Sequence, residues 1–355
     1  LTQGRMAARA LVVDSRVLAA AALGPDAPAD VRELLEAAVL ASQATVEHGD
    51  PTEVALVSAA ASIGMDPEKA RRAHELRAAH PFDSFRKRMT LVRYAAGGAV
   101  AYVKGAPKET LALCETIRRG GTAVALTDDI RRAVLAEHDR LAAEGLRMLA
   151  VATRRLPVDG DGATAAVESE LTLLGIVGLW DPPRPEVEGA IAACRSAGIR
   201  VIMVTGDYGL TAGAIARQIG LPVAKVVTGD EVERMSPGAL RGLVGEPGVL
   251  FARTSPAHKL AIVTALKEEG EVVAMTGDGV NDAPALKAAA IGVAMGRRGT
   301  EVAKEAAEMV IADDNFASIV AAIRQGRAIY ANMGKFVTYI FASNVPELVP
   351  FLAFV

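Results

Sequence analysis

The spacing of apolar residues divides the chain into two stretches of different character. In the first stretch, apolar residues recur at helical intervals over residues 31–44 and 52–64, which predicts two helices. Runs at 10–13 and 91–103 predict strands, the second run being two strands around a Gly97-Gly98 turn. Loops are predicted at Gly120-Gly121 and over residues 157–162. This stretch therefore mixes strands with helices.

A strongly apolar run at 171–179 ends where Pro182 and Pro183 force a turn, and the pattern then changes. Helices are predicted over residues 187–197, 211–219, 256–267 and 283–290, and strands over residues 200–204, 249–252, 271–275, 291–295 and 309–311. Such alternation predicts an α/β domain with a parallel, doubly wound sheet. Functional side chains of these sheets follow the carboxyl ends of strands.

Composition narrows the possible classes. Hydrophobic residues make up 51% and charged residues 23% of the 355 residues, which is typical of globular domains. A net charge of −3 gives no basic field, so we expect no nucleic-acid partner. Cys114 and Cys194 stand far apart without metal-ligand spacing, and we interpret them as reduced thiols of a cytosolic protein.

The last residues are almost wholly apolar. Residues 336–355 match the length of about 20 residues that a membrane-spanning helix needs. Arg324, Arg327 and Lys335 precede them, and basic residues on that flank are typical of the cytoplasmic side of a membrane. A buried C-terminal helix is the alternative.

The strongest chemical signal lies at residues 275–287, after an apolar run. Gly277 and Gly279 permit a tight turn, and Asp278 and Asp282 bring two carboxylates to the end of a predicted strand. Carboxylate oxygens suit Mg²⁺, and Asn281 adds a neutral polar group beside them. The alternative is a glycine-rich turn with solvated aspartates.

Two weaker signals accompany that loop. Thr205-Gly206-Asp207 follows a predicted strand, where a hydroxyl and an amide can donate hydrogen bonds to a phosphoryl oxygen. Lys259 lies at the start of a predicted helix and can neutralise phosphoryl charge. Alone, the tripeptide is more often a turn and the lysine more often a surface residue.

In this order and combination, the segments resemble the haloacid dehalogenase-like phosphoryl-transfer fold and, more specifically, P-type ATPases. The resemblance extends over nearly the whole chain and includes the segments 49–53, 82–89, 104–107, 145–147 and 181–184. It implies a nucleotide-binding domain at 1–179 inserted into a Rossmann-like phosphorylation domain at 180–325. The start of a transmembrane helix would follow at 326–355.

The resemblance also implies roles for single residues. In the first domain, Phe82 would stack on adenine, Glu53 would contact the adenine edge, and Lys104 would line the base and phosphate pocket. Arg147 would reach the phosphates of ATP. The implied nucleotide-binding set is completed by Lys87, Gly105, Asp181 and Arg253. An aromatic face suits a base, and cations suit a polyphosphate, although each residue alone has an ordinary structural reading.

In the second domain, the resemblance implies that Asp278 coordinates Mg²⁺ and that Asn281 and Asp282 keep this site ordered. Thr205 and Gly206 would hold the phosphoryl group. Lys259 would stabilise its charge. Asp207 and Asp181 would lie on the hinge side of the nucleotide path, and His258 is expected to be a neighbour of Lys259 rather than a catalyst.

The family nucleophile is the aspartate of Asp-Lys-Thr-Gly-Thr, which Leu-Thr follows directly. The chain begins with Leu1-Thr2, so we expect the nucleophile and its strand to lie outside these residues. The 355 residues alone are then expected to be inactive, and the loss of a central strand puts the stability of the second domain in doubt.

The final segment resembles the fifth transmembrane helix of calcium and sodium/potassium pumps. Asn344 and Glu347, with carbonyls freed near Pro346, would coordinate a transported cation. Ca²⁺ is our first expectation, and Na⁺, K⁺ and Mn²⁺ stay open. The implied partners are ATP, the cation, the lipid bilayer, and the remaining transmembrane and actuator domains of a pump. The protein would lie in the cell membrane with residues 1–325 on the cytoplasmic side.

Two other functions are consistent with parts of the pattern. A soluble haloacid dehalogenase-type phosphatase with a large cap predicts neither a membrane anchor nor an adenine pocket. A non-catalytic nucleotide-binding module would not explain the phosphoryl-site residues.

Overall fold

The structure is a computed structural model of the chain, and it describes residues 1–83, 85–95, 97–157 and 167–353. The side chains of Ala95, Glu347, Leu348 and Phe351 are outside the description. The chain forms two compact units. The N-terminal unit comprises Thr2–Arg184 with Thr205–Arg217, and the C-terminal unit comprises Leu1, Pro185–Val204 and Gln218–Val355. Each unit is described by itself.

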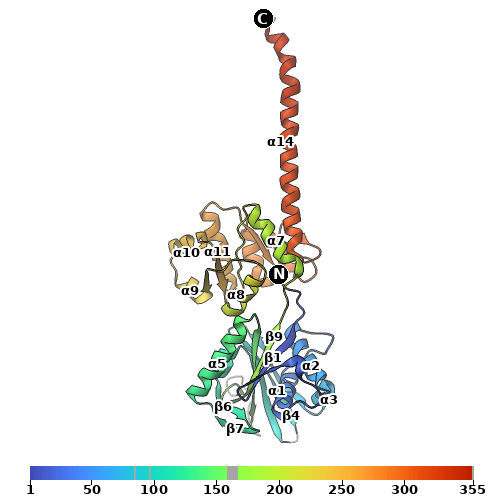
Figure 1. Cartoon of the computed structure of the whole chain (residues 1–355), viewed down its shortest axis with the longest axis vertical. Helices are drawn as coiled ribbons and strands as arrows, with labels where there is room; N and C mark the ends of the chain where they lie inside the picture. The colour runs from blue at the N-terminus through green and yellow to red at the C-terminus, as the bar shows by residue number, and fades with distance from the viewer. Residues whose placement is uncertain (84, 96, 158–166, 354–355) are drawn as a thin grey trace. The chain divides into compact units, whose positions relative to one another are not determined.

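A large sheet organises the N-terminal unit (Figure 1). Its strands are β1 (Ala7–Val13), β2 (Arg16–Ala19), β3 (Glu75–Asp83), β4 (Arg88–Ala95), β5 (Gly98–Gly105), β6 (Cys114–Arg119), β7 (Thr122–Ala125), β8 (Arg147–Arg155) and β9 (Leu171–Trp180). The main order is β2-β1-β9-β8-β5-β4-β3, and β6 pairs with β9 and β7. The hairpin predicted at 91–103 is confirmed, because β4 and β5 pair antiparallel out to Ala95 and Gly98. The predicted loop at 157–162 lies largely outside the described residues.

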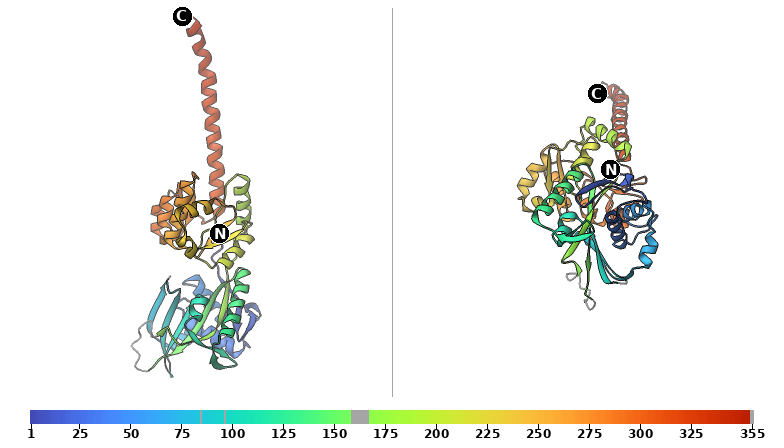
Figure 2. Two further views of the ribbon diagram at one scale, coloured as in Figure 1. Left: turned by 90° about the vertical axis from the view of Figure 1, so that its left-hand side faces the viewer. Right: turned by 60° about the horizontal axis from the view of Figure 1, so that its bottom comes forward.

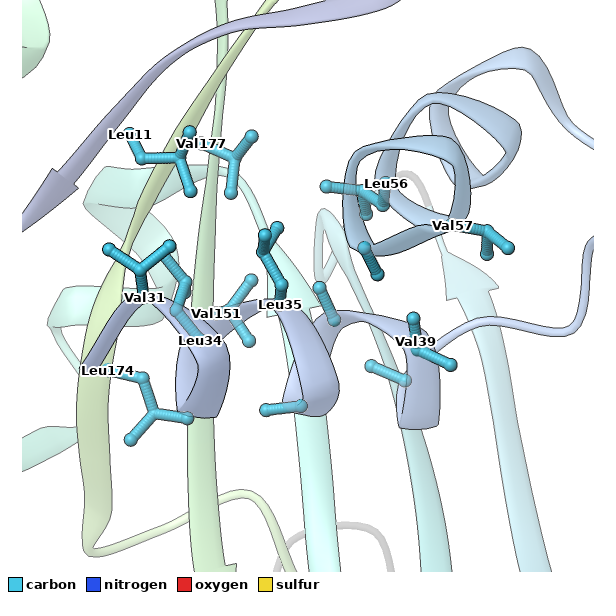
Figure 3. Packing of buried hydrophobic residues seen from close by; sticks show 14 of the residues in the cluster. Leu11, Val31, Leu34, Leu35, Val39, Leu56, Val57, Val151, Leu174 and Val177 are labelled. Atoms are coloured by element: carbon cyan, nitrogen blue, oxygen red, sulfur yellow. The ribbon is translucent and has the colours of Figure 1, made fainter. Parts of the chain in front are cut away.

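Helices pack on both faces of this sheet. They are α1 (Ala29–Leu40), α2 (Pro51–Ser62), α3 (Pro67–Arg72), α4 (Pro107–Leu111) and α5 (Asp128–Ala143), with a 3-10 turn at Ala20–Ala22. Leu34, Leu35 and Leu56 from α1 and α2 pack against Val151 and Val177 of the sheet (Figure 3). The two helices predicted from apolar spacing are thus confirmed, each ending a few residues before its predicted end.

The opposite face of the sheet carries a second core. There α4 and α5 contribute Leu111, Val134 and Leu141, which pack against Leu173 and Ile176 of β9. Residues of β9 therefore enter both cores, which explains why the 171–179 run is apolar throughout rather than alternating. Figure 2 shows the same sheet and its helices from two further directions.

The C-terminal unit has short parallel strands. These are β10 (Lys225–Thr228), β11 (Val249–Ala252), β12 (Ala274–Gly277), β13 (Ile291–Met295) and β14 (Met309–Ile311). Its helices are α7 (Pro185–Ser196), α9 (Gly229–Arg234), α10 (Pro237–Gly245), α11 (Pro256–Glu268), α12 (Ala283–Ala288), α13 (Glu301–Ala306) and α14 (Phe316–Ala353), with a 3-10 turn at Val280–Asp282. Helix α8 (Gly209–Gln218) runs from the segment grouped with the N-terminal unit into this one.

The strands of this unit pair in parallel as predicted, but they do not form a single doubly wound sheet. Within the described part of the chain, the parallel strands form two separate sheets, β10-β11 and β12-β13-β14. The predicted strand at 200–204 makes only a single parallel bridge, between Val204 and Phe251, with one further bond from the Phe251 amide to the Met203 carbonyl. One bridge does not build a ladder, so this segment does not join the two sheets.

The long helix α14 covers the apolar C-terminal stretch (Figure 1). Large apolar side chains along it are exposed, including Phe336, Tyr339, Phe341 and Leu352. Among the residues that were described, none of the helices has the length and apolar character required to cross a membrane. The predicted start of a transmembrane helix is therefore unconfirmed.

Candidate functional site

Strand register brings most of the predicted nucleotide-binding residues to one end of the large sheet. Asp83 pairs with Arg88, and Arg88 pairs in turn with Gly105, so one row crosses β3, β4 and β5. Gly105 pairs with Ala150 of β8, which sets Arg147 at the same end. Residues 82, 87, 104, 105 and 147, far apart in the sequence, thereby lie toward the same end of the sheet, on β3, β5, β8 and the turn before β4.

Glu53 and Lys104 form a buried ion pair at this end. The Lys104 Nζ atom lies 2.5 Å from Glu53 Oε1, and it also donates to the Ala41 carbonyl at 2.5 Å and to Ser42 Oγ at 3.0 Å. The other oxygen, Oε2, accepts hydrogen bonds of 2.8 Å from the amides of Gln43 and Ala44. Both side chains are buried, so in this arrangement they tie α2 to β5 and to the end of α1.

The environment of this pair acts on both pKa values. Burial opposes the charged form of Glu53, but the charge and hydrogen bond of Lys104, together with two backbone amides, hold its pKa below the ordinary value. Burial lowers the pKa of Lys104, and Glu53 opposes that shift. Glu53 is therefore ionised at neutral pH, and its contact with an adenine edge stays a prediction.

The predicted stacking residue, Phe82, lies at the end of β3, beside the turn that leads to β4. Phe82 is 64% exposed, and Phe85 in the adjoining turn is 91% exposed. The Asp83 carboxylate accepts hydrogen bonds from the amides of Phe85 and Arg86, at 2.9 and 2.8 Å, and these amides lower its pKa. Phe82 is thus an exposed aromatic face beside a backbone that Asp83 fixes.

Lys87 and Gly105 close this turn against β5. Lys87 has a positive φ of 55°, its amide donates to the Asp83 carbonyl at 2.6 Å, and its ammonium lies 2.7 Å from Glu109 of α4. A Cβ on Gly105 would lie 2.5 Å from the Arg88 Cβ and 2.8 Å from the Lys87 carbonyl oxygen. Only glycine therefore fits at position 105.

Arg147 is exposed at the start of β8. Its Nε atom lies 3.9 Å from Asp207 Oδ1, in the 205–217 segment grouped with the same unit. The Asp207 amide donates to Thr205 Oγ1 at 3.1 Å, which closes the turn around Gly206. Asp181 accepts a hydrogen bond of 3.1 Å from the Arg5 amide. Arg147 is thus an exposed cation that could meet an anionic ligand.

The loop after β12 is organised by Asp282. One carboxylate oxygen of Asp282 accepts from the amides of Asp278 and Gly279 at 3.2 and 3.1 Å, and the other lies 2.6 Å from Lys259 Nζ. Asp282 is buried, whereas Asp278 and Asn281 are exposed. A Cβ on Gly277 would lie 2.5 Å from the Asp282 Cβ, so the close approach requires glycine. Asp282 thus shapes the loop while Asp278 faces outward.

The donor set of this loop is compatible with Mg²⁺. Within the described residues, no group of three or more His, Cys, Asp or Glu side chains could hold a metal ion. Mg²⁺ typically takes one or two protein carboxylates and completes its shell with water and substrate phosphate. The exposed Asp278 carboxylate meets that requirement.

Segment 253–259 joins β11 to α11. Arg253 has a positive φ of 54° directly after the strand. Ser255 caps α11 by accepting from the His258 amide, while the Ser255 amide donates to the His258 ring at 3.2 Å. His258 is therefore a capping residue, a role that the predicted helix start at 256 could have indicated.

The structure does not bring all predicted residues into one described site. Thr205, Gly206 and Asp207 belong to the N-terminal unit, and Lys259, Asp278 and Asp282 belong to the C-terminal unit. Of the two proposed cation ligands on α14, Asn344 is exposed, and the structure does not describe the side chain of Glu347. Sequence reasoning missed Glu168, a buried carboxylate that binds Arg86, Arg88 and Thr90.

Known protein families match segments in both halves of the chain. The model of the P-type ATPase cytoplasmic domain N matches residues 30–186, and a haloacid dehalogenase-like hydrolase model matches residues 259–323. A calcium-transporting ATPase of Bacillus subtilis (strain 168) is 44% identical over 316 residues, covering 86% of this chain and 35% of the relative. The chain belongs to the P-type cation-transporting ATPase family.

Other P-type ATPases agree with this assignment. Calcium-transporting ATPase 1 of Bacillus cereus is 40% identical over 327 residues, covering 90% of this chain and 36% of the relative. Probable cation-transporting ATPase F of Mycobacterium tuberculosis is 44% identical over 314 residues, covering 86% and 34%. The chain spans about a third of the length of these curated relatives. The expected P-type resemblance is confirmed, and a soluble phosphatase outside this family is not supported.

Proposed function

We propose that the chain is the ATP-binding and phosphoryl-transfer part of an ion-transporting P-type ATPase that moves Ca²⁺. The observation that carries this proposal is the loop after β12. There Asp282 uses both of its oxygens on Lys259 and on two loop amides, which leaves the Asp278 carboxylate exposed. A loop held in this way offers one outward carboxylate for Mg²⁺ on ATP, as phosphoryl transfer requires.

The N-terminal unit would bind the nucleotide. The exposed Phe82 would stack on adenine, Arg147 would attract the phosphates, and Lys87 would belong to the nucleotide-binding set without a phosphate contact of its own. The buried Glu53–Lys104 pair and Gly105 would hold the end of the sheet that carries them. Asp181 and Arg253, placed after β9 and β11, would complete the nucleotide path.

The phosphoryl acceptor would be an aspartate supplied by the longer protein. Asp278 would hold Mg²⁺, which would neutralise charge on the transferred group. Thr205 and the Gly206 amide would donate hydrogen bonds to that group, and Lys259 would stabilise its negative charge. Asp282 and Asn281 would keep the loop in place, and Asp207 would lie beside the path of the nucleotide.

The proposal of Ca²⁺ rests on the relatives, two of which are named calcium-transporting ATPases. Exposed apolar side chains along the distal part of α14 support an apolar environment for that segment, for which we propose the lipid bilayer and neighbouring transmembrane helices. Asn344 and Glu347 are the proposed cation ligands there. The protein would be located in the cell membrane, with residues 1–325 on the cytoplasmic side.

The nucleotide part is tested by titration calorimetry of the 355-residue chain with ATP, with and without Mg²⁺. We expect saturable ATP binding that Phe82→Ala weakens, whereas Asp278→Asn leaves adenine recognition intact. The matched control is Phe85→Ala, because Phe85 lies three residues further on, in the adjoining turn, and is even more exposed. No measurable ATP binding by the unchanged chain would refute the proposal.

The transport part is tested on the full-length protein in vesicles. Ca²⁺, rather than Na⁺, K⁺ or Mn²⁺, should stimulate formation of an acid-stable phosphoenzyme from γ-labelled ATP. Glu347→Gln should reduce that stimulation without changing nucleotide affinity, because it removes one charge from the proposed ion site. Stimulation by a different cation would reject Ca²⁺ and keep the ATPase assignment.

A further inference from the structure

Glu168 is a buried carboxylate to which the nucleotide-binding residues give no role. Its side chain is 2% exposed. Oε1 lies 2.5 Å from an Arg86 guanidinium nitrogen and 2.6 Å from Thr90 Oγ1, and Oε2 accepts from Arg88 Nε at 2.7 Å. All three partners lie in the β3–β4 turn or in β4, about 80 residues away in sequence.

These contacts fix the turn next to Phe82. Arg86 donates from its second terminal nitrogen to the Pro81 carbonyl at 2.8 Å, and Arg88 donates to the Arg86 carbonyl at 3.0 Å. Glu168 therefore reaches the backbone on the N-terminal side of Phe82 through one arginine. It reaches the C-terminal side of the turn through the other arginine.

The charges explain why a carboxylate is needed at this position. Three consecutive cations, Arg86, Lys87 and Arg88, run from the turn into the start of β4. Glu109 pairs with Lys87, and the buried Glu168 offsets the charges of the two arginines. Burial opposes ionisation of Glu168, but hydrogen bonds from Thr90, Arg88 and Arg86 outweigh it and hold its pKa below the ordinary value. Phe82, at the end of β3, is 64% exposed beside the turn that these contacts hold.

We propose that Glu168 is a positioning residue for base recognition, which holds the β3–β4 turn so that Phe82 presents its face to the adenine ring. This role rests on the proposed ATP binding. A carboxylate that only stabilised the fold would affect all ligands of the unit equally. A positioning residue affects the base and spares the phosphates.

The experiment compares Mg²⁺-ATP with Mg²⁺-tripolyphosphate, which lacks the base, by calorimetry of the full 355-residue chain. The variants are Glu168→Gln, Glu168→Asp and the control Glu170→Gln. Glu170 is a suitable control because its side chain is 60% exposed and its carboxylate lies 2.7 Å from the Arg154 guanidinium. A double variant, Phe82→Ala with Glu168→Gln, tests whether the two residues act through one another.

We expect Glu168→Gln to weaken ATP binding by about tenfold, a part of the stacking contribution of one aromatic residue, with tripolyphosphate affinity unchanged. Glu168→Asp should recover part of the loss, and Glu170→Gln should bind ATP like the unchanged chain. In the Phe82→Ala background, Glu168→Gln should have little further effect.

Unchanged ATP affinity in Glu168→Gln, or an equal loss for ATP and tripolyphosphate, would overturn the role. Should Glu168→Gln not fold, Thr90→Val removes one hydrogen bond to the same carboxylate at similar size, and the same criterion applies. If the unchanged chain binds tripolyphosphate but not ATP, the proposed function fails and this role fails with it. If it binds ATP and the variants match it, only the role of Glu168 fails.

Discussion

Replacing Lys104 by methionine should destabilise the N-terminal unit by about 3 kcal/mol. The Lys104 ammonium has three acceptors and is buried together with Glu53. Removing one partner of a buried ion pair leaves the other charge without compensation, which costs about 3–5 kcal/mol. Because Glu53 keeps its two bonds from the Gln43 and Ala44 amides, the lower end of this range is expected.

A double variant separates the charge effect from packing. In Glu53→Gln with Lys104→Met, no buried charge remains, and the glutamine oxygen can still accept from the same two amides. The loss should then fall to about 1 kcal/mol, since replacing a buried pair by neutral groups is often nearly neutral.

The unfolding assay has a built-in probe. Trp180 is the only tryptophan of the chain, and it ends β9 with the Arg9 guanidinium 4.4 Å from its ring centroid. Its fluorescence in a urea titration therefore reports on the N-terminal unit, provided that the slope of the transition is the same in all variants. A loss below about 1 kcal/mol in Lys104→Met, or a double variant less stable than the single one, would refute the buried-pair reasoning.

Three further outcomes follow from the contacts. Phe82→Ala should weaken ATP binding by about 1–3 kcal/mol by calorimetry, while Phe85→Ala should change it little. Folding lowers the pKa of Glu168, so on acidification the unfolded chain takes up this proton before the folded chain does. The stabilisation from Glu168 is therefore present above the ordinary pKa of 4.5 and is lost as the pH falls below it. Glu168→Gln should reduce this loss of stability at acid pH, as measured by urea titrations. Burial raises the pKa of Cys114 to about 12, so a thiol reagent near neutral pH should label Cys114 only after unfolding.

The sequence predicted the secondary structure best where one pattern decided it. Helices α1 and α2, the β4–β5 hairpin and strands β11, β13 and β14 follow from apolar spacing and turn residues. Missed elements such as β6 and α5 have mixed patterns, because α5 is amphipathic with many exposed charges and β6 is half exposed. The segment 200–204 has strand composition but lacks a ladder partner, and pairing is a property of the tertiary structure.

The sequence names candidate site residues but says little about what each side chain contacts in the fold. Motifs identified Glu53, Lys104 and Asp282, but a motif does not report which carboxylate oxygens are already used inside the fold. Glu168 was not predicted, because its partners are about 80 residues away in the sequence and no sequence motif relates residues at that separation. Only the register of β3, β4 and β5 brings such groups together.

Burial separates the predicted residues into two kinds with different experimental signatures. Glu53, Lys104 and Asp282 are buried and already bonded within the protein, so their substitution should change stability first and ligand affinity as a consequence. Phe82, Arg147, Asp278 and Asn281 are exposed, so their substitution should change affinity without a comparable change in stability. A loss of ATP binding in a variant of the first kind is therefore evidence for a direct contact only when the variant unfolds at the same urea concentration as the unchanged chain.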